Sequence, residues 1–190
     1  MSDPSERAVL TDFIEELHRE FPSFRIVKKA ESRFANAIDV ALKILTLGGQ
    51  REFMDRYYTV IGDTLYVPIG WEETDPIDAV ITLRHERIHL RQRRRLTFPL
   101  MILVYLFLPL PLGLAYGRAR LEWEAYSETL RATLELRGVE ALRSTRLKER
   151  IVTQFTSPAY GWMWPFRSAV EGWYDAKVSE LLTEPPAIER

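Results

Sequence analysis

The stretch DPIDAVITLRHERIHLRQRRR, residues 75–95, decides how the rest of the sequence is interpreted. It predicts a helix that begins at its Asp-Pro pair, since aspartate caps helices and proline suits the first helical position. On that helix His85 and His89 are four residues apart, so they project from the same face, one turn apart. Both imidazoles can therefore reach one tetrahedral metal ion.

Glu86 follows the first histidine and places a carboxylate beside the pair, where it can take a proton from a zinc-bound water. HERIH thus has the HExxH pattern of zinc metallopeptidases, with Glu86 as the catalytic general base. At about 100° per residue, the two histidines point in one direction between apolar flanks. The nearly opposite face of the helix carries Arg84, Arg87, Arg91 and Arg94. We expect the histidines to face inward and the arginines to face outward, where acidic partners neutralise them.

Composition narrows the remaining chemistry, since the 190 residues include 26 Lys and Arg, 27 Asp and Glu, three histidines and no cysteine. The length suggests one domain with a full hydrophobic core. The lack of cysteine excludes disulfides, thiolate metal ligands and a cysteine nucleophile. A formal net charge of −1 argues against nucleic acid as a partner held through bulk charge. The N-terminus has no apolar signal segment, so we expect a cytoplasmic protein.

A zinc ion at this helix needs a third protein ligand and an open position for water. No histidine follows His89 and the chain has no cysteine, so we expect the third ligand to be a carboxylate. The best candidates lie in RLEWEAYSE on the next predicted helix, and they are Glu122, Glu124 and Glu128. The remaining histidine, His18, lies just outside the apolar stripe of the first predicted helix, and we expect it at the surface.

The HExxH helix and the downstream RLEWEAY, residues 120–126, resemble the gluzincin metallopeptidases. RLEWEAY resembles the R-x-E-x-E-A-D pattern of the membrane-embedded CAAX-endopeptidase-like family, and the arrangement also looks like that of the compact minigluzincins. The Zn²⁺ ligands that this resemblance implies are His85, His89 and Glu122. Tyr126 stands where the family has an Asp that orients a histidine ligand; its phenol can donate to an imidazole but carries no negative charge. Glu124 is the alternative ligand.

An uncharged apolar run, LTFPLMILVYLFLPLPLGLAYG at residues 96–117, separates the two predicted zinc-ligand helices. Because His89 and Glu122 must meet at one metal ion, this run has to turn back on itself. Each arm is only about ten residues long, too short to cross a bilayer as a helix. We expect an inserted apolar hairpin. It is either buried under the aromatic residues of 159–166, or it makes a peripheral membrane contact through residues 91–117, with the arginines beside lipid phosphates.

Apolar periodicity and turn residues predict the remaining elements. Gly62-Asp63 joins two short alternating segments, which predicts a β-hairpin just before the HExxH helix, and Ser5 is the predicted cap of the first helix. Predicted helices cover residues 5–20, 31–47, 75–95, 118–137, 139–155 and 166–182, and predicted strands cover residues 24–29, 57–61 and 64–68. The expected fold is α+β, mostly helical: a single zincin-like domain over residues 1–190 with a small β-hairpin or sheet before the active-site helix.

These observations predict a zinc metalloendopeptidase of the gluzincin type that acts on a peptide or protein substrate. Glu86 activates the zinc-bound water and later protonates the leaving amine. A further hydrogen-bond donor for the oxyanion could be Tyr57, Tyr58 or Tyr160. The alternative is a catalytically weak or inactive zincin-scaffold protein that acts as a membrane-surface or partner-binding module.

Overall fold

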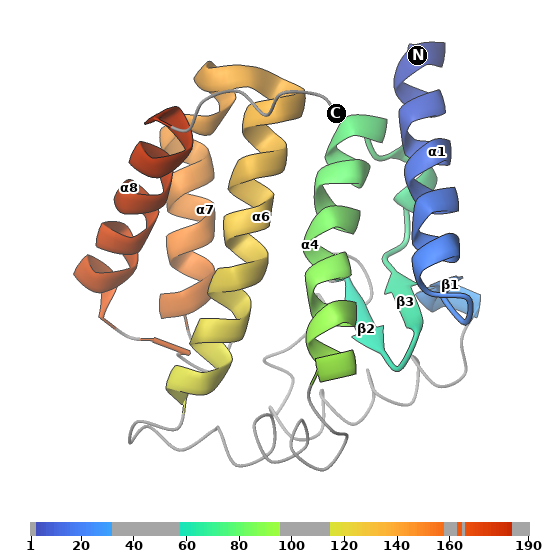
Figure 1. The fold of residues 1–190 in the computed structure, drawn as a ribbon, viewed down its shortest axis with the longest axis horizontal. Coiled ribbons are helices and arrows are strands. Elements are labelled where there is room, and N and C mark those ends of the chain that lie inside the picture. The colour runs from blue at the N-terminus through green and yellow to red at the C-terminus, as the bar shows by residue number, and fades with distance from the viewer. Residues whose placement is uncertain (1–2, 32–57, 96–114, 158–162, 165, 184–190) are drawn as a thin grey trace. The chain divides into compact units, whose positions relative to one another are not determined.

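The structure is a computed structural model that describes residues 3–31, 58–95, 115–157, 163–164 and 166–183. In this part of the chain there are five α-helices and one three-stranded sheet, which confirms the predicted α+β, mostly helical class (Figure 1). The chain divides into two compact units, Met1–Arg91 and Gln92–Arg190. The division falls inside helix α4 (Pro76–Arg95), whose last residues therefore belong to the second unit. A single zincin-like domain over the whole chain stays a prediction.

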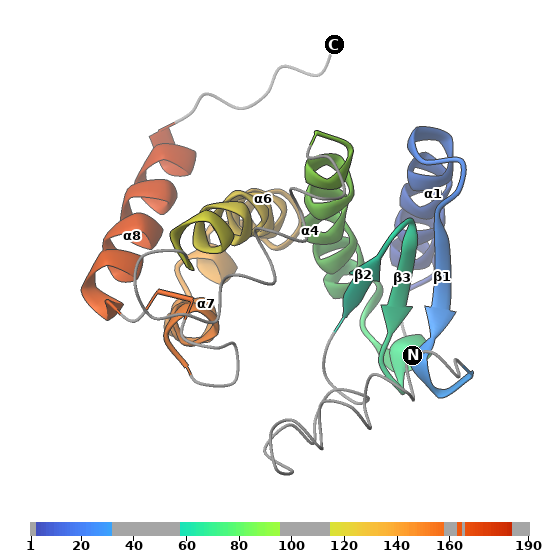
Figure 2. The ribbon, with the colours of Figure 1, turned by 90° about the horizontal axis from the view of Figure 1, so that it is seen from below.

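The sheet of the first unit consists of β1 (Arg25–Lys28), β2 (Thr59–Ile61) and β3 (Thr64–Val67), which lie side by side in the order β1-β3-β2 (Figure 2). β1 pairs parallel with β3, and β2 pairs antiparallel with β3. Gly62, in the turn between β2 and β3, has a φ of 63°, a left-handed value that two-residue hairpin turns use. The predicted hairpin is therefore confirmed.

Acidic side chains cap the two α-helices of the first unit. The predicted cap of α1 (Pro4–Glu20) is wrong by two residues, because Asp3 is the cap and accepts a hydrogen bond from the backbone N of Ser5 at 3.0 Å. The Pro after Asp3 suits the first helical position, so the helix can begin earlier than Ser5. At the start of α4, Asp75 Oδ1 accepts from two backbone N–H groups of the first turn, at 3.0 and 3.1 Å, as predicted.

Both helices and the sheet contribute to the core of the first unit. Its buried members are Leu17, Phe21, Phe24, Leu65, Val67, Leu83 and Leu90. Leu83 precedes the two histidines in α4 and Leu90 follows them, and each leucine is at most 1% exposed. Burying a leucine side chain stabilises the fold by about 1.5–3 kcal/mol. This packing therefore sets the rotation of α4 about its own axis, and with it the direction of the histidine face.

The second unit contains α6 (Ala115–Leu142), α7 (Thr145–Thr156) and α8 (Arg167–Thr183). Its core joins the apolar faces of all three helices, and the largest buried side chains in it include Leu130, Leu142, Ile151, Phe155 and Met163. Trp164 stacks on Trp173 of α8, with ring centroids 5.9 Å apart and an interplanar angle of 26°. In the aromatic stretch 159–166, Met163 and Trp164 belong to this core or pack against it, whereas Phe166 is exposed.

The predicted helix over residues 139–155 is wrong in its bounds. Gly138 has a φ of 82°, a value outside helical geometry, but residues 139–142 resume the helix and complete α6. The real break comes at Ser144, which has extended backbone (φ −60°, ψ 123°) and occupies the N-cap position of α7. The Ser144 side chain makes no capping hydrogen bond, so the break lies in the backbone, which leaves helical geometry at this residue.

Several predictions concern residues outside the described part of the chain. They are the helix over 31–47 beyond its first residue, the apolar hairpin over 96–117 as far as residue 114, and the two tyrosines Tyr57 and Tyr160. The predicted end of the hairpin is wrong, because residues 115–117 belong to α6. Among the helices of the described residues, none combines the length and apolar character needed to cross a membrane.

Candidate metal centre

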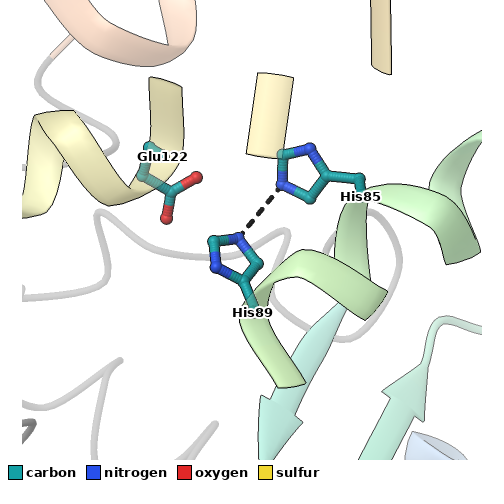
Figure 3. Close-up of side chains that lie close together, drawn as sticks. All are labelled: His85, His89 and Glu122. Carbon is teal, nitrogen blue, oxygen red and sulfur yellow. Dashed lines mark hydrogen bonds between the residues drawn. The ribbon is translucent and has the colours of Figure 1, made fainter. Parts of the chain in front are cut away.

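The two histidines of HERIH lie on adjacent turns of α4, and one ring nitrogen of each points toward the other ring (Figure 3). Their Nε2 atoms are 3.2 Å apart, and the ring centroids are 4.9 Å apart at an interplanar angle of 73°. Two nitrogen ligands of a tetrahedral zinc ion, each about 2.0–2.1 Å from the metal, are roughly 3.3 Å apart. The spacing of the His85 and His89 nitrogens therefore fits a shared metal ion.

Glu122 supplies a carboxylate oxygen to the same group. One ligand atom from each of His85, His89 and Glu122 lies within 4.8 Å of the others (Figure 3). Two imidazoles and one carboxylate are a donor set that catalytic zinc sites use, with a fourth position left for water. All three side chains are half-buried, which suits a site that must admit a substrate.

Glu124, the alternative ligand, has other contacts. Its Oε2 accepts a hydrogen bond from Gln92 Nε2 at 3.0 Å, and its Oε1 is 3.6 Å from Arg95. The side chain is 49% exposed. On a helix, residues two apart point in nearly opposite directions, so Glu122 and Glu124 cannot both face the histidines. Neither Glu124 nor Glu128 belongs to the group that the described residues offer to a metal.

Glu86, the predicted general base, is a buried carboxylate on α4 with 8% exposure. Its negative charge acts on Tyr58, one of the three predicted oxyanion donors. Burial is the main cause that raises the pKa of Tyr58, the charges of Glu86 and Asp78 raise it further, and a hydrogen bond with Thr74 opposes the rise. The phenol therefore stays protonated at neutral pH and remains a hydrogen-bond donor.

The arginine face of α4 meets acidic residues of α1. Arg87 donates to Glu16 at 2.7 Å and also pairs with Glu20, while Arg91 donates to Glu20 at 2.6 Å. These hydrogen bonds, that from Arg91 above all, lower the pKa of Glu20. For Arg87 and Arg91, the predicted pairing with acidic residues is confirmed.

Two further predicted residues have contacts of their own. The ring of Tyr126 packs on Phe155 in the second unit, with centroids 5.5 Å apart, so its predicted role of orienting a histidine stays a prediction. His18 is exposed, as predicted, and its Nδ1 donates to the carbonyl of Ile14 at 3.0 Å.

One residue of the histidine face escaped the sequence analysis. Gln92, three residues after His89, is buried and donates to the backbone carbonyl of Leu121, the residue before Glu122. Its position on the same helical face as both histidines was a usable signal, but the surrounding arginines suggested a solvated segment.

Comparison with known proteins finds no protein-family model, no curated protein and no solved structure that matches this chain.

Proposed function

We propose that this chain is a zinc-dependent metalloendopeptidase of the gluzincin type, with Zn²⁺ held by His85, His89 and Glu122. The observation that carries the proposal is the approach of these three side chains to within 4.8 Å, beside a glutamate that follows the first histidine. A metal-binding role alone would account for the three ligands. The additional carboxylate of Glu86 on the same helix favours hydrolysis, because it provides a base where an attacking water would lie.

In the proposed reaction, the bound zinc ion and Glu86 have different roles. Zinc, when bound, supplies Lewis-acid chemistry that acidifies a water molecule and polarises the substrate carbonyl. Glu86 accepts the proton of the attacking water and then gives it to the amine that leaves, so the peptide bond breaks without net proton transfer to the enzyme. Because Glu86 is buried, water would screen its attraction to a bound zinc ion only weakly.

The test is hydrolysis of an unfolded protein substrate, such as casein, by the purified zinc-loaded chain and its Glu86→Gln variant. Glutamine keeps the size of the side chain but removes the base, so activity should fall by about 10²–10⁴-fold. Bound zinc should be retained, because Glu86 is not one of the proposed ligands. Glu140→Gln, an exposed position near the end of α6, is the matched control and should keep full activity.

Two outcomes would count against the proposal. Equal activity in Glu86→Gln would mean that another group, or a contaminant, hydrolyses the substrate. A zinc-loaded chain that cleaves no peptide bond would favour the alternative of a zincin-scaffold binding module.

The proposal also places the protein in the cytoplasm, with residues 91–117 as the segment to examine for peripheral membrane contact. Co-sedimentation of the intact chain with anionic vesicles, reversed by salt, would support that contact. Absence of co-sedimentation at low salt would leave the apolar run as a buried hairpin.

A further inference from the structure

Gln92 is a buried polar residue at the C-terminal end of α4. It is 5% exposed, although it lies in the run RQRRR, where its neighbours along the chain are arginines. At about 100° per residue, position 92 falls on the same helical face as His85 and His89, one turn beyond the second histidine. His85, His89 and Gln92 therefore form one row along this face of α4, which we call the histidine stripe.

The amide of Gln92 has two contacts with α6 inside the second unit. Its Nε2 donates to the backbone carbonyl of Leu121 at 2.9 Å and to Glu124 Oε2 at 3.0 Å. An amide NH₂ has two hydrogens, so these two bonds use its full donor capacity. Leu121 and Glu124 lie on the same turn of α6 as Glu122, the proposed third ligand.

We propose that Gln92 is a positioning residue that holds the Glu122 turn of α6 beside the histidine stripe and so sets the metal affinity of the site. This inference rests on the proposed zinc function. A carboxylate that must approach two imidazoles loses affinity when its backbone can drift, and loss of such outer contacts typically costs 10–100-fold in metal affinity. The hydrogen bond to a backbone carbonyl fixes the main chain itself, so it does not depend on side-chain rotamers of α6.

The same geometry predicts that Gln92 contributes little to the fold. The Leu121 carbonyl faces the helical hydrogen-bond ladder of α6 as well, and Glu124 is exposed enough for water to replace the amide. Gln92→Met keeps the length and burial of the side chain but removes both donated bonds. We therefore expect an almost unchanged thermal midpoint for the metal-free protein, together with weaker zinc binding.

The experiment measures zinc affinity by competition with a chromophoric chelator, and thermal unfolding of the metal-free protein, for the full-length chain. Gln92→Met should bind zinc 10–100-fold more weakly than wild type. The matched control is Glu140→Gln, an exposed position near the end of α6, which should stay within about threefold of wild type. Substituting Co²⁺ adds a spectroscopic readout, because displacement of the carboxylate changes the visible absorption of the bound ion.

The outcomes separate this inference from the proposed function. If wild type binds no zinc, the proposed function fails. If wild type binds zinc and Gln92→Met binds it equally well, with the same Co²⁺ spectrum, only the positioning role is overturned. Should Gln92→Met not fold, Gln92→Leu provides the second variant: it keeps a buried apolar side chain, cannot donate to Leu121, and should show the same loss of affinity.

Discussion

At the scale of single residues, the choice between two nearby glutamates decides the metal site. Glu122→Gln replaces one carboxylate ligand by a neutral amide, so zinc affinity should fall by at least the 10–100-fold seen for loss of a ligand's supporting partner. Glu124→Gln, two residues away, should leave the zinc content unchanged, because that side chain contacts Gln92 and Arg95. Metal analysis of both variants after dialysis checks the prediction. Loss of zinc from Glu124→Gln alone would reverse the assignment.

Tyr174 gives the second unit a predictable response to alkaline pH. Its hydroxyl donates to the carbonyl of Leu142 at 2.8 Å, and burial, with the negative charge of Asp175 adding to it, raises its pKa to about 12. In the unfolded chain the Tyr174 phenol ionises near pH 10. Its contribution to folding stability is therefore complete below about pH 10 and is lost as the pH rises toward 12.

Tyr174→Phe tests that contribution. The variant should be less stable than wild type by about 1 kcal/mol at pH 8, because it leaves the Leu142 carbonyl without its donor. The difference should shrink between pH 10 and 12 as the wild-type advantage disappears. Urea unfolding of both proteins at several pH values measures it. A difference that stays constant up to pH 12 would contradict the assigned pKa.

How far the site could be predicted from the sequence also becomes clear at this scale. The histidine pair and Glu86 follow from spacing along one helix, because a helix fixes which residues share a face. The choice among Glu122, Glu124 and Glu128 does not, since these residues lie on another helix and no spacing along the chain selects one of them. Gln92 was missed for the same reason: its partners, Leu121 and Glu124, lie on another helix, and no local period reveals them.

At the scale of elements, Gly138 is the glycine of α6 whose backbone a side chain would strain. With φ at 82° and ψ at −178°, it occupies a region that is almost exclusive to glycine. A Cβ there would meet nothing within 4 Å, so the cost of Gly138→Ala is backbone strain alone, about 1–3 kcal/mol. Chemical denaturation measures the loss of stability.

Gly172, in the middle of α8, is the matched control. It has no positive φ and a Cβ there also meets nothing within 4 Å. Because alanine is the better helix former, Gly172→Ala should stabilise the protein by about 0.5–1 kcal/mol. Equal effects of the two substitutions would contradict the conformation assigned to Gly138.

The contact between α1 and α4 predicts a response to acid. Hydrogen bonds from Arg91 and Arg87 lower the pKa of Glu20 in the folded protein. The ionised Glu20 therefore stabilises the first unit above its unfolded pKa of about 4.5, and this stabilisation is lost as the pH falls through the folded pKa. Glu20→Gln should cost about 1 kcal/mol at pH 7 and progressively less as the pH falls below 4.5, as measured by urea unfolding. Glu15→Gln, exposed on the same helix, should change stability at neither pH.

Element prediction succeeded where local signals agreed and failed where the backbone breaks within a continuous apolar pattern. The hairpin at Gly62 and the start of α4 at Asp75 combine turn or capping residues with the expected apolar pattern, and both are confirmed. Between residues 139 and 155 the apolar period runs on without interruption, yet Ser144 divides the segment. A hydrophobic pattern does not register such a change in backbone conformation, so it could not predict where α7 begins.

At the scale of the whole molecule, the lack of cysteine and the scarcity of histidine limit the chain to one kind of zinc site. The described residues contain one group of metal-binding side chains, and it has the two-histidine, one-carboxylate composition that the sequence predicts.

The central claim is that this group holds one zinc ion, and X-ray absorption spectroscopy of the zinc-loaded, full-length protein tests it most directly. The account predicts one zinc per chain, with about two imidazole ligands and a shell of nitrogen and oxygen atoms at about 2.0–2.1 Å. In His89→Ala, the stoichiometric zinc and the imidazole scattering should both disappear. A chain that takes up no stoichiometric zinc, or that binds it without imidazole scattering, would contradict the account.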